Sequence, residues 1–205
     1  GVGGLARSAE LVTAVPDRAV LLVAVELCSL TFQRNDFSKA NLVGTGLFAD
    51  GAAAAVLTAD GEGPELLGSQ STLFENTEDI MGWEVVESGL KVRFSRDIPS
   101  FVRRYLPSLL AEASGQWGVG PEDLRYYLAH PGGPKVIEAY AESLDLPREK
   151  FVTAYDVLRN YGNMSSASVL FVLDRFLQSQ PPTGDYGVLL TLGPGFSSEQ
   201  ALFRW

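Results

Sequence analysis

Short apolar segments alternate along this chain with segments that have helical spacing. The clearest apolar run, at 19–27, is predicted to be a buried strand, and a helix is expected before it at 3–15. A second helix at 37–47 and a strand at 52–58 follow, and a run of acidic residues, glycine and proline at 60–64 interrupts the pattern. Strands that alternate with helices predict a layered α/β fold.

The same alternation continues beyond the interruption. We expect strands at 65–73 and 83–94, a helix at 98–115, a strand at 124–129, helices at 136–144 and 167–177, and final strands at 187–192 and 200–205. In the helix at 37–47, Ala40, Leu42 and Val43 are the residues available for burial. We place a boundary between two halves of the fold at the interruption, which gives units at 1–64 and 65–205.

The composition excludes several classes of partner. A formal charge of −9 argues against nucleic acid or an anionic membrane surface, and an anionic ligand would need a local basic patch. The single cysteine excludes an internal disulfide and fits a reducing cytoplasm. No apolar stretch approaches the roughly 18–20 residues of a membrane span. No group of His, Cys, Asp and Glu has metal-ligand spacing, so no metal site is expected.

Two polar residues stand in loops that favour chemistry. His130, the only histidine, lies in a Pro-Gly-Gly-Pro context, and Asn163 lies between a glycine and small polar residues. A neutral imidazole N–H and a carboxamide N–H aimed at one point would stabilise negative charge on a thioester oxygen. Taken alone, His130 would more often be a loop residue satisfied by backbone hydrogen bonds, and Asn163 would usually be a helix cap or turn residue. The pair resembles two thirds of a Cys-His-Asn condensing site.

A nucleophilic cysteine would complete that site. Cys28 is a poor candidate because it ends the apolar run, whereas an activated thiol needs a helix N-terminus or a cationic neighbour. The glycine-rich opening at 1–4 followed by helical spacing provides such a helix start. We therefore expect the nucleophile just upstream of Gly1.

Several motifs carry a resemblance to the type III polyketide synthases, the chalcone and stilbene synthase family of the thiolase-like group. They are Val25-Glu26-Leu27-Cys28-Ser29-Leu30-Thr31-Phe32, Gly46-Leu47-Phe48-Ala49-Asp50-Gly51-Ala52-Ala53, His130-Pro131-Gly132-Gly133-Pro134, Gly162-Asn163-Met164-Ser165-Ser166 and Gly193-Pro194-Gly195. The resemblance implies a thiolase-like layered fold, of which this chain would be the C-terminal half plus the end of the N-terminal half. A missing N-terminal segment would carry the cysteine.

The resemblance also implies an activity. Members of the family transfer an acyl group from coenzyme A to the cysteine, decarboxylate malonyl-CoA, and join the two by Claisen condensation, after which the product cyclises. By this resemblance, His130 would stabilise the thiolate and then donate to the thioester oxygen, and Asn163 would share the donor role.

Residues implied to line the substrate cavity are Cys28, Thr31, Gly44, Phe48, Val92, Ser165 and Pro194. Phe48 matches the aromatic residue where the coenzyme A tunnel meets the cavity, and the Thr31 hydroxyl would orient an intermediate. Val92 replaces the second aromatic gate of the plant enzymes, so the apolar wall would favour a long fatty acyl starter, although Phe94 could compensate. The stretch at 79–84 resembles bacterial alkylpyrone and alkylresorcinol synthases.

The loop after His130 resembles the coenzyme A-contacting loop of the family. Gly132, Gly133 and Pro134 would let the pantetheine arm approach, and Lys135 would add a positive charge toward phosphate, although an ordinary solvated lysine is equally consistent. The expected ligands are acyl-CoA and malonyl-CoA, with no permanently bound cofactor. The family also implies a homodimer in the cytoplasm.

Two alternatives remain open. A ketoacyl-carrier-protein synthase of the initiating type has the same catalytic residue types and fold, but its histidine and asparagine motifs differ from those quoted above. The chain could instead be a noncatalytic half that serves in dimerisation.

Overall fold

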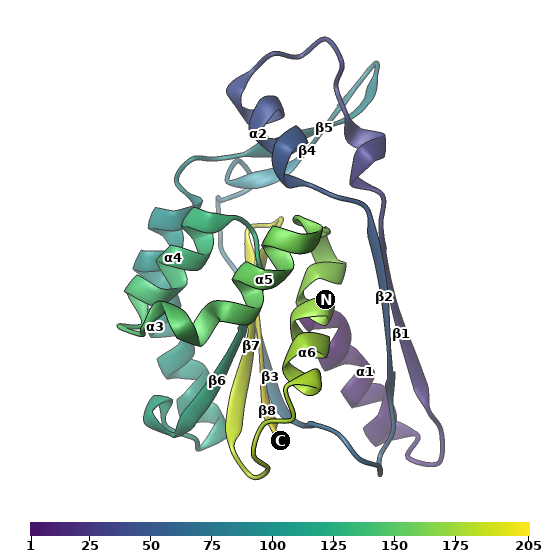
Figure 1. The fold of residues 1–205 in the computed structure, drawn as a ribbon, viewed down its shortest axis with the longest axis vertical. Helices are drawn as coiled ribbons and strands as arrows, with labels where there is room; N and C mark the ends of the chain where they lie inside the picture. Colours follow the sequence, from purple (N-terminus) through teal and green to yellow (C-terminus); the bar gives the residue numbers. More distant parts are fainter.

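The computed structural model describes all of residues 1–205 and arranges them in alternating layers of helices and sheets (Figure 1). The strands are β1 (Val20–Glu26), β2 (Gly51–Leu57), β3 (Glu65–Leu73), β4 (Met81–Val86), β5 (Gly89–Phe94), β6 (Leu124–Ala129), β7 (Tyr186–Gly193) and β8 (Ser197–Arg204). The helices are α1 (Val2–Ala14), α2 (Lys39–Leu47), α3 (Ile98–Trp117), α4 (Pro134–Ser143), α5 (Val152–Tyr161) and α6 (Ser168–Gln178). The predicted layered α/β class is confirmed.

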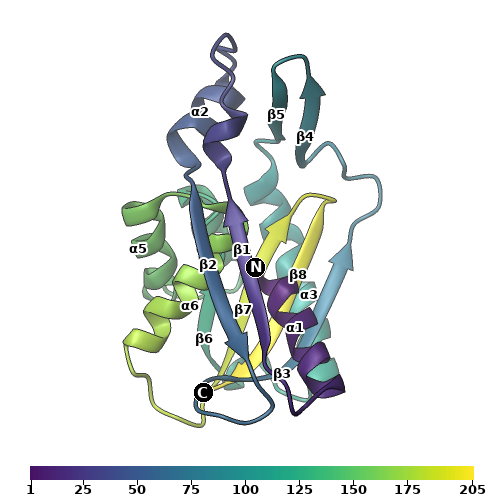
Figure 2. The same cartoon turned by 90° about the vertical axis from the view of Figure 1, so that its right-hand side faces the viewer.

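The strands form one large sheet and two small ones. The large sheet has the order β3-β8-β7-β6, in which only the β6–β7 pair is parallel. The strands β1 and β2 form a separate antiparallel pair, and β4 and β5 form a hairpin. In Figure 2 the β1–β2 pair lies on one side of the molecule, while α2 and the β4–β5 hairpin stand together above the layers.

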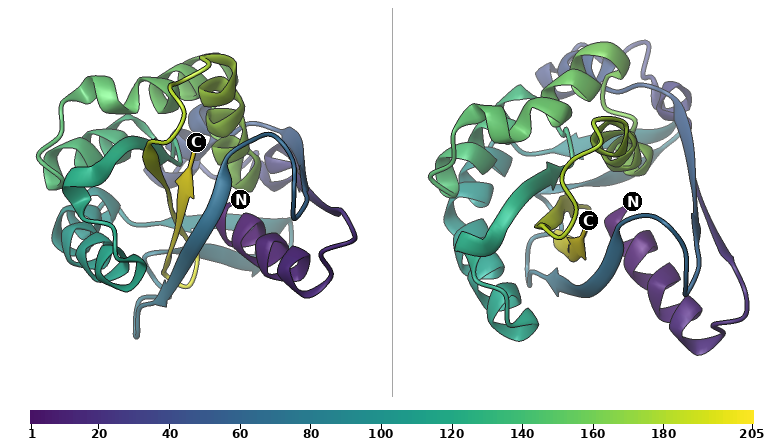
Figure 3. Two further views of the ribbon diagram at one scale, coloured as in Figure 1. Left: turned by 90° about the horizontal axis from the view of Figure 1, so that it is seen from below. Right: turned by 60° about the horizontal axis from the view of Figure 1, so that its bottom comes forward.

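Helices separate and cover the sheets. The helix α1 packs against both β1 and β8, and α6 packs against both β2 and β6, so these two helices lie between the sheets. The helix α3 covers the other face of the large sheet and packs along α4 (Figure 3). The helices α1 and α6 therefore form a layer between the β1–β2 pair and the large sheet.

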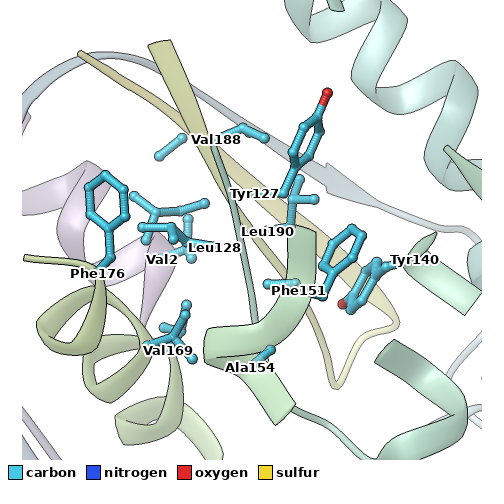
Figure 4. Close-up of a cluster of buried hydrophobic side chains, with 14 of the residues drawn as sticks. Val2, Tyr127, Leu128, Tyr140, Phe151, Ala154, Val169, Phe176, Val188 and Leu190 are labelled. Atoms are coloured by element: carbon cyan, nitrogen blue, oxygen red, sulfur yellow. The ribbon is translucent and has the colours of Figure 1, made fainter. Parts of the chain in front are cut away.

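The central core fixes the strand that carries His130. Tyr127 and Leu128 of β6 pack with Val188 and Leu190 of β7 in the cluster of Figure 4. At the end of β6 the His130 N–H donates to the Leu190 carbonyl oxygen at 2.8 Å. Because residues 187–190 of β7 are buried, this hydrogen bond holds the histidine backbone against a closely packed part of the strand.

Two predictions about burial are wrong. The strand β1 is not fully buried, since Leu21, Val23 and Val25 are 63%, 56% and 58% exposed. Alternate residues face α1, and a continuous apolar run does not distinguish burial on one face from burial on two. In α2, Leu42 and Val43 are exposed.

Polar contacts explain the orientation of α2. The buried residues of this helix are Asn41 and Gly44. The Asn41 carboxamide donates to the backbone oxygens of Gln33 and Asp36, at 3.0 and 2.7 Å, and this turns one face of α2 toward the preceding loop. The helix begins after Ser38, whose hydroxyl accepts from the Asn41 N–H.

Candidate active site

His130 is held as a neutral imidazole at the end of β6. Burial lowers the pKa of its side chain from the ordinary value of 6.5 to about 4. The ring lies over the following loop, because a Cβ built on Gly132 would be 3.5 Å from the His130 Cδ2 atom and 3.7 Å from Nε2. A neutral ring at pH 7 can donate an N–H without carrying charge.

Asn163 is fixed from both sides. Its backbone N–H donates to the Leu47 carbonyl oxygen, and its own carbonyl oxygen accepts from the Ala49 N–H, both at 2.9 Å. The side chain is 3% exposed; Oδ1 accepts from the Ser165 N–H at 2.9 Å. The Nδ2 group donates to the Gly132 carbonyl oxygen at 3.3 Å, which leaves a second N–H available.

The two predicted donors therefore meet at one residue. The His130 ring lies against Gly132, and the Asn163 carboxamide donates to the same residue. A thioester oxygen that reaches both side chains would find two neutral N–H donors in a largely buried place, where they stabilise developing negative charge more strongly than in water.

The start of α1 lies beside this pair. A Cβ built on Gly1 would be 2.6 Å from the Ser166 carbonyl oxygen and 2.3 Å from a Val169 methyl group, so the backbone there is in close contact with the loop after Asn163. The N-terminal end of a helix stabilises anions such as a thiolate. The start of α1 is thus close to the loop that follows Asn163.

An apolar contact lies between α2 and β5. A Cβ built on Gly44 would be 3.4 Å both from the Phe48 ring and from the Val92 Cγ1 atom, so Gly44 lies against both side chains. Phe94 presents an edge to the Phe48 ring, with 6.3 Å between the centroids. Phe48 and Phe94 thus form an aromatic pair at this contact.

A polar contact fixes the hairpin that carries Val92. The buried Gln33 side chain donates to the Leu90 carbonyl oxygen at 3.0 Å, and the Ser88 hydroxyl donates to its Oε1 atom. Lys91 forms an ion pair with Asp36 at 2.9 Å. Both contacts join the hairpin to the segment before α2, so they hold β5 and this segment together.

Cys28 does not have the environment of a nucleophile. It begins a short 3₁₀ helix at Cys28–Thr31 rather than lying on the strand, which corrects its expected position. Burial raises the pKa of its thiol, the contact with the Ser165 hydroxyl at 3.5 Å lowers it, and the charges of Glu26 and Asp50 raise it further. The thiol stays protonated at neutral pH.

Family comparisons extend this description. Residues 65–205 match the family model described as chalcone and stilbene synthases, C-terminal domain. The chain belongs to the chalcone and stilbene synthase family. A protein of Bacillus subtilis (strain 168) whose name assigns it to the chalcone synthases is 44% identical over 100% of this chain and 59% of that relative. A 1,3,6,8-tetrahydroxynaphthalene synthase of Streptomyces peucetius subsp. caesius is 41% identical over 100% of this chain and 56% of that relative.

Solved structures of type III polyketide synthases have the same fold. The 1,3,6,8-tetrahydroxynaphthalene synthase of Streptomyces coelicolor A3(2) superposes with a TM-score of 0.93 at 33% identity, over 99% of this chain and 59% of that one. Germicidin synthase from Streptomyces coelicolor superposes with a TM-score of 0.91 at 28% identity, over 100% of this chain and 55% of that one. The thiolase-like layered fold predicted from the motifs is confirmed. The chain spans a little over half the length of these relatives.

The remaining predicted positions of this member of the chalcone and stilbene synthase family lie around the same loops. The Thr31 hydroxyl donates to the Cys28 carbonyl oxygen at 2.7 Å, so only its lone pairs are free for an intermediate. Gly133 is buried, whereas Pro134 and Lys135 are exposed at the start of α4. Their contact with coenzyme A stays a prediction.

The loop that carries Pro194 contacts the segments around Thr77 and Phe101. Pro194 is exposed between β7 and β8, and the N–H of the nearby Phe196 donates to the Thr77 hydroxyl at 2.9 Å. The Phe196 ring packs on Phe101 with 4.9 Å between the centroids. These contacts tie the loop to the end of β3 and the start of α3, and its role in the cavity stays a prediction.

The sequence predicted no role for the contact between Glu26 and Ser166. The Glu26 carboxylate at the end of β1 accepts from both the N–H and the hydroxyl of Ser166. It thereby orients the loop between Asn163 and α6. The available signal was a carboxylate at the end of an apolar run, where an unpaired charge would be costly.

None of the helices of the chain combines the length and apolar character that crossing a membrane requires.

The histidine makes the stability of this chain pH-dependent. Its pKa is about 4 when folded and near 6.5 when unfolded, so below pH 6.5 the unfolded chain binds the proton more strongly. We expect His130 to reduce the free energy of unfolding progressively from pH 6.5 down to pH 4. Denaturant unfolding of the wild type and His130→Gln at several pH values measures this effect. The difference between the two should change over that interval and be constant above it; parallel profiles throughout would contradict the assignment.

Proposed function

We propose that the complete protein is a type III polyketide synthase that condenses malonyl-CoA with an acyl-CoA starter. The observation that carries the proposal is the meeting of His130 and Asn163 at Gly132. The membership of the chain in a family whose named members are synthases supports the same reaction class. The nucleophilic cysteine is proposed to lie just before α1, whose first residue contacts the loop after Asn163.

The proposed reaction uses the two donors repeatedly. The cysteine thiolate attacks the starter thioester carbon, and the coenzyme A thiolate leaves. Malonyl-CoA then loses CO₂, and the electrons of the broken C–C bond pass to its thioester oxygen, to which His130 and Asn163 donate. The carbon of this enolate attacks the acyl-cysteine carbonyl, and the cysteine thiolate leaves. In each step the chain's own contribution is to bind an oxygen that becomes negative.

Gly44, Phe48, Val92 and Phe94 are proposed to form a gate to the substrate cavity. The apolar surface of this gate supports the proposal of a long fatty acyl starter and a pyrone or resorcinol product. Val92 leaves space that an aromatic ring would fill, while Phe48 and Phe94 keep the wall apolar. A hydrophobic channel of this kind accepts a flexible chain, and each methylene group adds to the apolar surface that it buries. Cys28, Thr31 and Ser165 are proposed to line the adjoining cavity.

The starter proposal predicts a change in specificity for Val92→Phe. The added ring has contacts within van der Waals range of Phe48 and Gly44, so it should narrow the passage. We expect kcat/KM for long fatty acyl-CoA to fall by about 10–200-fold relative to that for a short acyl-CoA. Steady-state assays with starters of increasing length measure the ratio.

A matched control is available on the same hairpin. Val85 is 83% exposed, so Val85→Phe adds the same ring outside the passage and should leave the ratio unchanged. A wild-type preference for aromatic starters, or equal ratios for the two variants, would contradict the starter proposal. Turnover of carrier-protein thioesters with no turnover of free coenzyme A thioesters would instead favour a ketoacyl-carrier-protein synthase.

The organisation of the protein is also proposed. The two units are taken as 1–64 and 65–205, with the first contributing the gate helix α2 and the second contributing His130 and Asn163. We expect the complete protein to act as a cytoplasmic homodimer without a permanently bound cofactor. Light scattering coupled to size exclusion measures the oligomeric state.

A further inference from the structure

Two glutamines lie side by side in the large sheet. Gln200 of β8 is 1% exposed and stands directly opposite Gln70 of β3 in the antiparallel register. Residues that are directly opposite in such a pair project their side chains from the same face of the sheet, with their Cβ atoms about 4.5–5.5 Å apart. The two carboxamides therefore share one place in the core.

The helix α3 covers the face of the sheet that carries this pair (Figure 3). Trp117 of α3 lies against β3, since a Cβ built on Gly68 would be 2.6 Å from the Trp117 Cδ1 atom. Gly68 and Gln70 are two residues apart on β3, so they share this face. The residue of β8 before the buried glutamine, Glu199, points the other way, because its carboxylate lies against Gly3 of α1. The glutamine pair and α1 are therefore on opposite faces of the large sheet.

The protein does not satisfy the polar atoms of this pair. Neither the oxygen nor the nitrogen of the Gln200 carboxamide has a hydrogen-bond partner in the chain, and the oxygen of Gln70 has none either. A third unsatisfied group is the hydroxyl of Ser114, which is 4% exposed and lies one turn before Trp117 on α3. Because nearly all buried polar groups in folded proteins bind either protein or ordered water, three such groups beneath one helix indicate a bound ligand.

The chemistry of these groups indicates a small neutral ligand. Gln200 has two N–H donors and an acceptor oxygen, Gln70 adds an acceptor oxygen, and the Ser114 hydroxyl can donate or accept. None of these side chains is charged, so they would not neutralise a buried ion. A water molecule both donates and accepts, and buried water molecules typically make about three hydrogen bonds to groups of this kind.

We propose that Gln70, Gln200 and Ser114 form an internal water-binding site between the large sheet and α3. The bound water joins β3 and β8 to the helix that covers them. Gln200 also stands directly opposite Leu190 of β7, whose carbonyl oxygen accepts from the His130 N–H at 2.8 Å. The site thus supports the strands that hold the histidine, from the face of the sheet opposite α1. The inference goes beyond the proposed function and does not depend on it.

A crystal structure of the complete protein tests the site directly. We expect an ordered water molecule within about 3.2 Å of a carboxamide atom of Gln200 and of a side-chain atom of Gln70 or Ser114. The double variant Gln70→Met/Gln200→Met should lose this water, because methionine is of similar length but offers only a weak acceptor. A wild-type structure without a water that bridges these side chains, whether the carboxamides pair directly or stay apart, would overturn the site.

Denaturant unfolding of the complete protein gives a second measurement. Gln200→Met leaves the bound water and the Gln70 oxygen without a partner, so the unfolding equilibrium constant should rise by roughly 10–100-fold. The double variant removes these groups together, and its rise should be smaller than the product of the rises for Gln70→Met and Gln200→Met.

A matched control is available on α3. Gln116 is exposed on this helix, and Gln116→Met should change the unfolding equilibrium constant by less than about 3-fold. A Gln200→Met variant that is as stable as this control would overturn the site. Effects of the two core variants that multiply in full would also overturn it, since glutamines that share one water cannot act independently.

Discussion

Replacing Asn163 by alanine should slow the decarboxylation of malonyl-CoA by about 100–1,000-fold in the complete protein, since that is the usual effect of losing one oxyanion donor. The side-chain N–H of Asn163 has a fixed direction, because Oδ1 is held by the Ser165 N–H and Nδ2 by the Gly132 carbonyl oxygen. His130→Gln should cause a loss of the same order. The double variant should lose less than the product of the two, because the donors act on one oxygen.

Two further variants distinguish chemistry from folding. Asn163→Asp keeps an oxygen that can accept from the Ser165 N–H but has no N–H to donate, so it should fold and still be slow. Asn160→Ala is the control, because Asn160 is exposed on α5 and its carboxamide donates only to Asp156. Release of CO₂ from malonyl-CoA is the measurement. A rate for Asn163→Asp close to that of the wild type would contradict the donor role.

Phe151→Ala should lower the free energy of unfolding by about 3–5 kcal/mol, the range for removing a fully buried aromatic side chain. The Phe151 ring is 0% exposed and stacks on the Tyr140 ring with 6.2 Å between centroids. It also packs near Tyr127 of β6, as Figure 4 shows, and so fills the space between α4 and the strand that ends at His130.

The control for this prediction is another phenylalanine. Phe37 is 80% exposed, and Phe37→Ala should change the free energy of unfolding by less than about 0.5 kcal/mol. Denaturant unfolding of the complete protein gives both values as differences from the wild type. Similar losses for the two variants would contradict the assignment of Phe151 to the core.

Local patterns predicted most of the elements. The helix at 98–115 and the strand at 124–129 were identified from spacing alone, and α3 (Ile98–Trp117) and β6 (Leu124–Ala129) are the corresponding elements. Apolar spacing sets which face of an element is buried, so such segments carry their own signal. The sequence pattern predicts no helix at 152–161, where the structure has α5 with Ala154 and Val157 buried.

Contacts between segments that are distant in the sequence could not be predicted from the local sequence pattern. The strand order β3-β8-β7-β6 is not sequential, and nothing local in β3 indicates that β8 is its partner. The exposure of Leu21 and the burial of Asn41 depend in the same way on what packs against each face. The Glu26–Ser166 contact joins residues 140 positions apart. Pairing across such distances is set by the tertiary fold, which individual propensities do not encode.

The most direct test of the account is a crystal structure of the complete protein with a malonyl-CoA analogue that cannot lose CO₂. The account predicts that the thioester oxygen lies about 2.7–3.1 Å from both a ring nitrogen of His130 and Nδ2 of Asn163. An analogue whose thioester oxygen contacts neither side chain, in a protein where the two face separate cavities, would contradict it.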